Sequence, residues 1–165
     1  MSMIGNLLRI KESELAAYLK DSSLLRDRIY SEDANSENLV DIDKAWDGII
    51  FLLTGRNLFD AYDHPLSKIL FSGQIIDEEQ DLGYGPAHYS TPEQVSELNS
   101  QISVITIDSL KPNFDPKKMT ESDVYPSIWE EGDDAFDYLA DGFSTVQRVY
   151  AEAAKNGEAV ITFLN

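Results

Sequence analysis

The six residues just before the C-terminal Asn165 place the strongest limit on what this chain can fold into. The segment Ala159–Leu164 is apolar at every position except Thr162. A run of this kind is typical of a strand covered on both faces, so other elements must pack on each side of its sheet. A second strand is expected within residues 3–10, where β-compatible residues recur but Gly5 weakens the pattern.

A long helix is expected immediately before the final strand. It should begin at Asp133 or Asp134 and end at Lys155-Asn156-Gly157. Gly142 lies inside it, at some cost in helix propensity, and we expect it to let another element approach closely. Apolar residues recur at spacings of three and four along one side, which indicates a buried face: Phe136, Leu139, Phe143, Val146, Tyr150 and Ala153.

Two further helices have clear start or stop signals. One should begin with Asp43 as its N-cap and end before Gly55, with a buried stripe of Trp46, Ile49, Ile50 and Leu53. The other should begin after Thr91, with Pro92 at its first position and Gln94 closing a capping box.

The remaining segments are less regular. Short helices are expected after Ser13 and near Leu24, and a polar loop over residues 31–38. Residues 102–107 could form a strand or an apolar connector, because periodicity does not decide over six residues. The prediction is an α+β fold in one domain, residues 1–165. A small sheet containing both terminal strands should pack with several helices.

Charge limits the classes of partner. The 165 residues contain 13 Lys and Arg against 30 Asp and Glu, a net charge of −17. Such a charge repels phosphate backbones and anionic lipid surfaces, so we expect neither a nucleic-acid nor a membrane partner. The longest apolar run, residues 49–53, is far shorter than a membrane helix. We see no signal peptide and no cysteine, which favours a cytoplasmic protein.

The sequence gives little support for a metal site or for a catalytic nucleophile. The two histidines, His64 and His88, lie far apart in the sequence, and there is no thiolate to complete a zinc site. The segment 41–45 fails the third ligand position of an EF-hand loop and lacks the glycine after it. No Ser-based nucleophile motif or Walker pattern is present. We therefore expect no metal and no cofactor, and assign no catalytic residue.

One candidate pocket combines a glycine turn with aromatic and acidic side chains. The Gly83-Tyr84-Gly85 turn could present backbone amides to a polar ligand, although a plain tight turn explains it as well. Asp47 lies beside the apolar stripe and should be exposed, whereas Trp46 is more typical of a core residue and Asp43 of a cap. The candidate pocket residues are Asp43, Trp46, Asp47, Gly83, Tyr84, Gly85, His88, Tyr89 and Tyr125.

The second candidate site is an acidic surface at the start of the last helix. Acidic residues near a helix N-terminus are also stabilised by the helix dipole, so a solvated face is the simple interpretation. The alternative is a docking surface for a basic protein, where charge complementarity raises the association rate. The candidate residues are Glu130, Glu131, Asp134, Asp137 and Asp141.

Six segments spread over the chain form a shared pattern: residues 3–5, 41–48, 52–55, 83–87 with Tyr89, 91–93 and 123–126. Together they resemble the bacterial YfbM-like family, a domain of unknown function. The resemblance implies a single-domain α+β protein of the cytoplasm and implies no activity.

Two functions from different classes remain open. The first is an acidic interaction protein that engages a basic protein partner through the acidic surface. The alternative is a small-molecule-binding enzyme or sensor that uses the Gly/Tyr/His-lined pocket. The sequence does not decide the oligomeric state.

Overall fold

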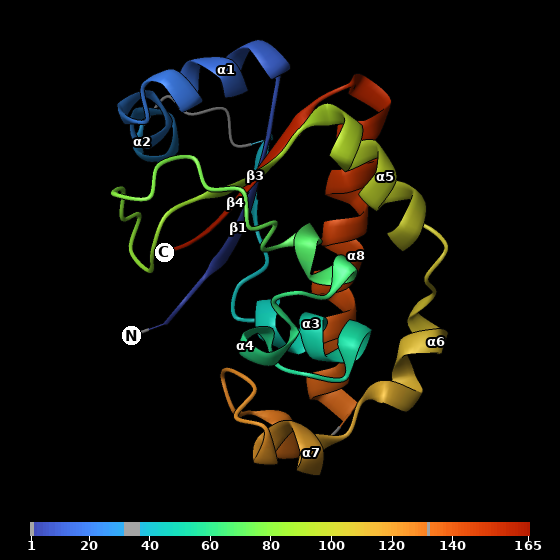
Figure 1. Cartoon of the computed structure of the whole chain (residues 1–165). Coiled ribbons are helices and arrows are strands. Elements are labelled where there is room, and N and C mark those ends of the chain that lie inside the picture. Colours follow the sequence, from blue (N-terminus) through green and yellow to red (C-terminus); the bar gives the residue numbers. More distant parts are fainter. Residues whose placement is uncertain (1, 32–36, 132) are drawn as a thin grey trace.

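An antiparallel sheet lies at the centre of the fold (Figure 1). The structure is a computed structural model that describes residues 2–31, 37–131 and 133–165, apart from the side chains of Glu131 and Asp133. Within these residues the sheet has four strands in the order β2-β1-β4-β3. Their bounds are Gly5–Ile10 for β1, Leu39–Asp41 for β2, His88–Ser90 for β3 and Ala159–Leu164 for β4.

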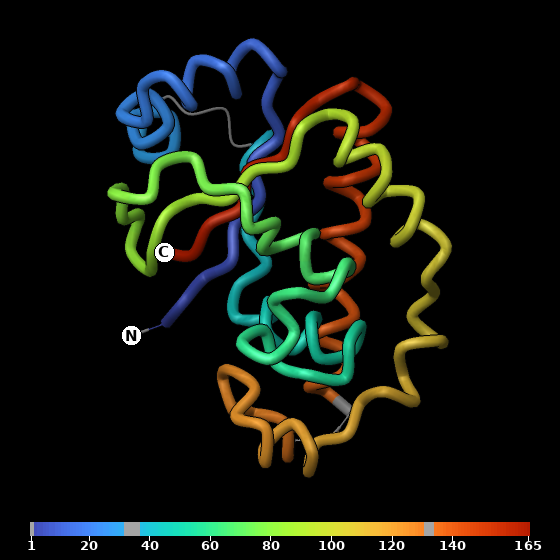
Figure 2. The backbone as a smooth tube through the Cα atoms, viewed as in Figure 1, coloured from blue at the N-terminus to red at the C-terminus, as the bar shows by residue number. Residues whose placement is uncertain are grey.

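The two terminal strands pair with each other in the middle of the sheet, which confirms their prediction. Leu7 on β1 lies opposite Thr162 on β4, and Leu8 lies opposite Ile161. Just beyond the strands, the Ile4 N–H donates to the Asn165 carbonyl over 2.8 Å, and the Asn165 N–H donates back over 3.1 Å. The first and last segments of the chain therefore run side by side (Figure 2).

Helices cover the sheet on both faces. Helices α1 (Glu12–Lys20) and α2 (Ser23–Tyr30) lie on one side, and α3 (Trp46–Thr54), α5 (Pro92–Ile102) and α8 (Asp133–Asn156) lie on the other (Figure 1). The strand residues divide accordingly, since successive side chains point to opposite faces. Leu8, Ile161 and Phe163 belong to the core beneath α1 and α2, and Leu7 and Val160 to the larger core beneath α8.

Short helices complete the α8 side of the molecule. They lie on the same side of the sheet as α8 (Figure 1), and several of them contribute buried residues to the larger core, among them Ala61, Ile69 and Leu110. Their bounds are Leu58–Ala61 for α4, Pro65–Ile69 for η1, Ile107–Leu110 for α6, Lys111–Asn113 for η2, Pro116–Glu121 for α7 and Trp129–Glu131 for η3. None of the helices in the described residues is both long and apolar enough to cross a membrane.

The signals at the start of α5 and the end of α3 are confirmed. The Gln94 N–H donates to the Thr91 hydroxyl over 3.3 Å, and the Thr91 N–H donates to Gln94 Oε1 over 2.9 Å. Gly55 follows α3 in the left-handed conformation, with φ of 79°. These bonds satisfy backbone groups that a helix end leaves without partners.

The predicted N-cap of α3 is wrong by two residues, because the N-cap is Ala45. Asp43 is not its N-cap: the helix begins at Trp46, and Asp43 has a left-handed φ of 51°. Sheet pairing extends past β2 instead, because the Gly5 N–H donates to the Asp43 carbonyl over 3.0 Å. The Asp41 carboxylate then accepts the Asp43 N–H over 3.1 Å and forms the turn that leads into the helix.

Two glycines bring α3 and α8 into close contact, as expected for Gly142. A Cβ atom at Gly142 would lie 3.0 Å from the Ala45 Cβ. A Cβ atom at Gly48 would lie only 2.5 Å from a Leu139 methyl carbon and 2.8 Å from the Trp129 ring. The helices pack at this distance because both positions lack a side chain.

The short strands were not predicted. β2 and β3 have three residues each, too few for a period of two to be recognised. Residues 103–106 connect α5 to α6, with Ile102 ending the first helix and Ile107 beginning the second, so the connector is correct and the strand is not. The expected loop at 31–38 lies largely outside the described residues, as does the side chain of Asp133, one of the two expected caps of α8.

Candidate functional site

Four of the rings near α3 form a continuous aromatic row. Trp46 stacks on Tyr125, with ring centroids 5.3 Å apart and planes at 22°. Phe71 meets the Trp46 ring edge-on at 5.8 Å, and His88 meets Phe71 edge-on at 5.5 Å. Three of the predicted pocket residues, Trp46, Tyr125 and His88, are therefore joined through Phe71, which sequence reasoning did not select.

Polar contacts tie this aromatic row to the N-terminal segment. The Trp46 indole N–H donates to the Met3 carbonyl over 3.0 Å, and the Met3 N–H donates to the Tyr125 hydroxyl over 2.9 Å. Trp46 is buried, with only 5% of its surface exposed. These contacts give Trp46 and Tyr125 a structural role that anchors the chain before β1.

Asp47 is buried, so the expectation that it is exposed is wrong. Its Oδ1 accepts the Leu58 N–H over 2.8 Å, and its Oδ2 accepts the Tyr125 N–H over 2.9 Å. The carboxylate thus joins α3 to Leu58 and Tyr125, which lie 11 and 78 residues further along the chain. Burial raises the pKa of Asp47, and the two backbone hydrogen bonds oppose that rise.

Asp43 faces α8 and does not share a pocket with Asp47. Its carboxylate accepts a 2.7 Å hydrogen bond from the Tyr138 hydroxyl, which itself accepts the Lys44 N–H over 2.8 Å. Burial and the adjacent Asp43 carboxylate both raise the pKa of Tyr138, so the phenol stays protonated and donates. This contact places Asp43 beside the acidic residues of α8.

His88 lies on β3 as a neutral acceptor. Its Nδ1 accepts the Gly73 N–H over 3.1 Å, and burial lowers the pKa of the ring. His88 lies opposite Thr162, on the sheet face that packs against α8. Tyr89 is the next residue and packs into the core on the opposite face. The sheet therefore separates these two predicted pocket residues.

The glycine turn uses its amides internally. The Gly83 and Gly85 N–H groups both donate to Asp81 Oδ1, over 2.8 and 3.1 Å. The Tyr84 N–H donates to the Leu164 carbonyl over 3.2 Å. The turn is thereby bound to the end of β4, and its three amides already have acceptors.

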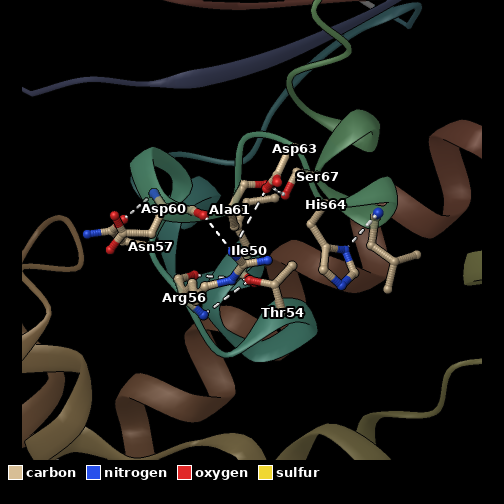
Figure 3. A network of polar contacts seen from close by, with 10 residues as sticks. Ile50, Thr54, Arg56, Asn57, Asp60, Ala61, Asp63, His64 and Ser67 are labelled. Carbon is tan, nitrogen blue, oxygen red and sulfur yellow. Dashed lines mark hydrogen bonds and ion pairs between the residues drawn. The ribbon is translucent and has the colours of Figure 1, made fainter.

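A polar network shapes the chain between α3 and η1 (Figure 3). The Thr54 hydroxyl donates to the Ile50 carbonyl over 2.8 Å, and an Arg56 guanidinium N–H donates to the Asp60 carbonyl over 2.8 Å. At its far end the Ser67 hydroxyl donates to the Ala61 carbonyl over 2.7 Å. These bonds hold η1 in place against the larger core.

The surface is hollowed elsewhere, in places the sequence did not indicate. A cavity of about 270 Å³, here called the glutamine cavity, lies between η1, β3 and α5. A second hollow of about 410 Å³ lies between the end of α3 and the η2–α7 segment. None of the nine predicted pocket residues lines either hollow. The lining of the glutamine cavity is Pro65, Lys68, Ser72, Gln74, Ser90, Gln94, Glu97, Leu98 and Gln101.

The predicted acidic residues of α8 lie on one exposed side of that helix. Asp134, Asp137 and Asp141 are all exposed and fall within about 60° of one another around the helix axis. Glu130, in η3, is exposed as well, whereas the side chain of Glu131 lies outside the described residues. We call Glu130, Asp134, Asp137 and Asp141 the α8 acidic face.

None of the carboxylates of this face makes an ion pair with another residue in the part of the chain that the structure describes. The ion pairs found there are Arg9–Glu158 at 2.8 Å and Arg56–Asp63 at 3.8 Å, both away from the α8 acidic face. The described residues also contain no group of three or more His, Asp or Glu side chains that could hold a metal ion together.

Comparison with known proteins places the chain in a family. The domain of unknown function DUF1877 matches residues 1–163. The chain belongs to this family. It is 26% identical to the protein YfbM of Escherichia coli (strain K12) over 130 residues, which cover 78% of this chain and 75% of that protein.

A solved structure shows the same fold. It is the crystal structure of YfbM from Escherichia coli, described as a protein of unknown function. The two structures agree with a TM-score of 0.78 and 20% sequence identity, over 98% of this chain and 99% of the other. The resemblance to the YfbM-like family and the α+β fold are therefore both confirmed for this DUF1877 member.

Proposed function

We propose that this DUF1877 protein is an interaction protein that binds a basic protein partner through the α8 acidic face. The observation that carries the proposal is that these carboxylates are exposed and make no ion pair among the described residues. Four exposed carboxylates lie on α8 and η3, and none makes an ion pair with another described residue. A basic partner would have no internal ion pair to displace.

The rigidity of α8 supports the same proposal. The helix runs over 24 residues, and its opposite face is buried through Leu139, Phe143 and Val146. Asp134, Asp137 and Asp141 therefore project from a backbone fixed by the core. Charges held in place in this way lose little conformational freedom on binding.

Asp43 extends the acidic surface beyond the helix. The Tyr138 hydroxyl holds its carboxylate beside α8 over 2.7 Å. Together with the net charge of −17, this concentration of carboxylates favours fast, salt-dependent association with a basic surface.

The test compares two variants of equal net charge. The first is Asp134→Asn, Asp137→Asn and Asp141→Asn. The control is Asp27→Asn, Glu78→Gln and Glu79→Gln, whose residues are exposed on the α2 side of the sheet or its adjoining loop. Each variant loses three carboxylates, so −17 becomes −14 in both. A lysine-rich peptide is titrated into each by calorimetry at low and high salt.

The proposal expects the loss of affinity to depend on position. Three exposed charge pairs at about 0.2–1 kcal/mol each weaken binding by about 3- to 150-fold in the α8 variant. The control should stay near the natural protein, because only long-range attraction is reduced. Equal losses in the two variants would show that net charge alone attracts the peptide, and would refute a specific face.

The alternative of a small-molecule enzyme or sensor was tied to the Gly/Tyr/His pocket. Its residues belong to separate places: Asp43 at α8, the glycine turn at the end of β4, and Tyr89 across the sheet from His88. Binding of a small molecule is better supported at the glutamine cavity, which involves none of them.

A further inference from the structure

One wall of the glutamine cavity is fixed by hydrogen bonds. Gln74 Nε2 donates to Gln94 Oε1 over 2.6 Å and to the Tyr89 carbonyl over 3.0 Å. Gln94 Nε2 donates back to Gln74 Oε1 over 3.2 Å, and the Ser72 hydroxyl donates to the Tyr89 carbonyl over 2.6 Å. A ligand would meet a polar wall that is already organised, which lowers the entropic cost of binding.

Three other side chains that line the cavity have no polar partner among the described residues. Lys68 on η1, and Glu97 and Gln101 on α5, line the cavity. Among the described residues they make no side-chain hydrogen bond and no ion pair, and Lys68 and Glu97 do not pair with each other. The cavity thus has one cation, one anion and one amide available to a ligand, above a fixed polar wall and the buried Leu98.

We infer that the glutamine cavity binds a small zwitterion of the α-amino acid class. Lys68 takes its carboxylate, Glu97 takes its ammonium group, and Gln101 contacts its polar side chain. The volume of about 270 Å³ lies just below the range of about 300–1,000 Å³ for drug-sized ligands, which suits a single amino acid. The site is separate from the α8 acidic face, so this inference stands or falls independently of the proposed function.

The test titrates L-glutamine into the natural protein, followed by amide NMR shifts. Two analogues accompany it: N-acetyl-L-glutamine, which lacks the ammonium charge, and the α-amide of L-glutamine, which lacks the carboxylate. We expect saturable shifts at the cavity residues at concentrations up to about 10 mM, where even a Kd near 1 mM gives high occupancy.

Two variants, each compared with the analogue that lacks the matching charge, test which ligand group Lys68 and Glu97 bind. Lys68→Met should weaken L-glutamine binding about three- to tenfold but leave binding of the α-amide unchanged. Glu97→Gln should weaken L-glutamine by a similar factor but leave the N-acetyl analogue unchanged. Both side chains are exposed, so the fold should tolerate these changes.

Matched controls use exposed charges outside the cavity. Glu93→Gln on α5 and Lys117→Met on α7 should bind L-glutamine as the natural protein does. Gln101→Trp fills the cavity and should abolish binding. The inference is overturned by an absence of saturable shifts, by shifts centred elsewhere, or by Lys68→Met and Glu97→Gln variants that bind as tightly as their controls.

Discussion

Replacing Asp47 with asparagine tests whether this buried carboxylate holds the fold together. The side chain accepts one backbone N–H on each oxygen, from Leu58 and from Tyr125. Asparagine keeps one acceptor oxygen, but its NH₂ group then faces the other N–H, donor against donor. A buried donor left without an acceptor costs about 1–3 kcal/mol, so we expect Asp47→Asn to lower the free energy of unfolding by about 2 kcal/mol.

Urea unfolding followed by tryptophan fluorescence measures this change, since Trp46 and Trp129 lie in the core. For a chain of 165 residues, about 2 kcal/mol corresponds to a fall in Tm of about 4–8 °C. The control is Asp60→Asn in α4, an exposed carboxylate close to Leu58. It should change the stability by less than about 0.5 kcal/mol.

An Asp47→Asn variant as stable as the control would contradict a structural role for this carboxylate. An increase in stability would also contradict it, and would indicate a carboxylate kept for chemistry at the expense of the fold. Asp47→Ala leaves both N–H groups without an acceptor, so it should be more destabilising than Asp47→Asn.

Three further predictions concern packing, pH and hydrogen bonding. Gly48→Ala places a Cβ within 2.5 Å of Leu139 and should cost about 1–3 kcal/mol in urea unfolding, more than Gly142→Ala, whose nearest contact is 3.0 Å; equal costs would contradict this packing. Burial lowers the pKa of His88, so the unfolded chain gains a proton there first and stability is lost as the pH falls below about 6.5. Unfolding measured at several pH values should show that loss in His64→Asn but not in His88→Asn, and a loss of equal size in both would oppose it. Tyr138→Phe removes the bond to the Asp43 carboxylate and should cost about 1 kcal/mol in thermal unfolding, whereas an unchanged Tm would argue against the contact.

The sequence predicted the elements whose signals are local or long. Ala159–Leu164 was recognisable as an apolar run interrupted only by Thr162, and the helix before it by apolar spacings of three and four over many residues. The capping box of α5 was recognisable because Thr91 and Gln94 stand three residues apart. The strands β2 and β3 were not, because they exist only through pairing with β1 and β4.

The burial of Asp47 shows why site prediction stopped short. Its position beside the apolar stripe suggested exposure, but its partners are the backbone N–H groups of Leu58 and Tyr125, which no side-chain pattern reveals. The glutamine cavity was missed for a related reason. Lys68, Gln74 and Glu97 come from three separate segments, and only the fold brings them to one cavity.

The arrangement of the α8 acidic face follows from the sequence, whereas its role in binding stays a prediction. Asp134, Asp137 and Asp141 follow helical spacing within a single element, so their common side could be inferred without tertiary contacts. What the sequence could not provide was Asp43, which reaches the same surface through a hydrogen bond from Tyr138, 95 residues further along the chain.

The most direct test of the proposed interaction surface is a map of amide NMR shifts in the natural protein on addition of a lysine-rich peptide. We expect the largest shifts along residues 134–141 and near Asp43, and we expect these shifts to fade as salt is added. Shifts spread evenly over the acidic surface, or centred on α1 and α2, would contradict a docking site on α8.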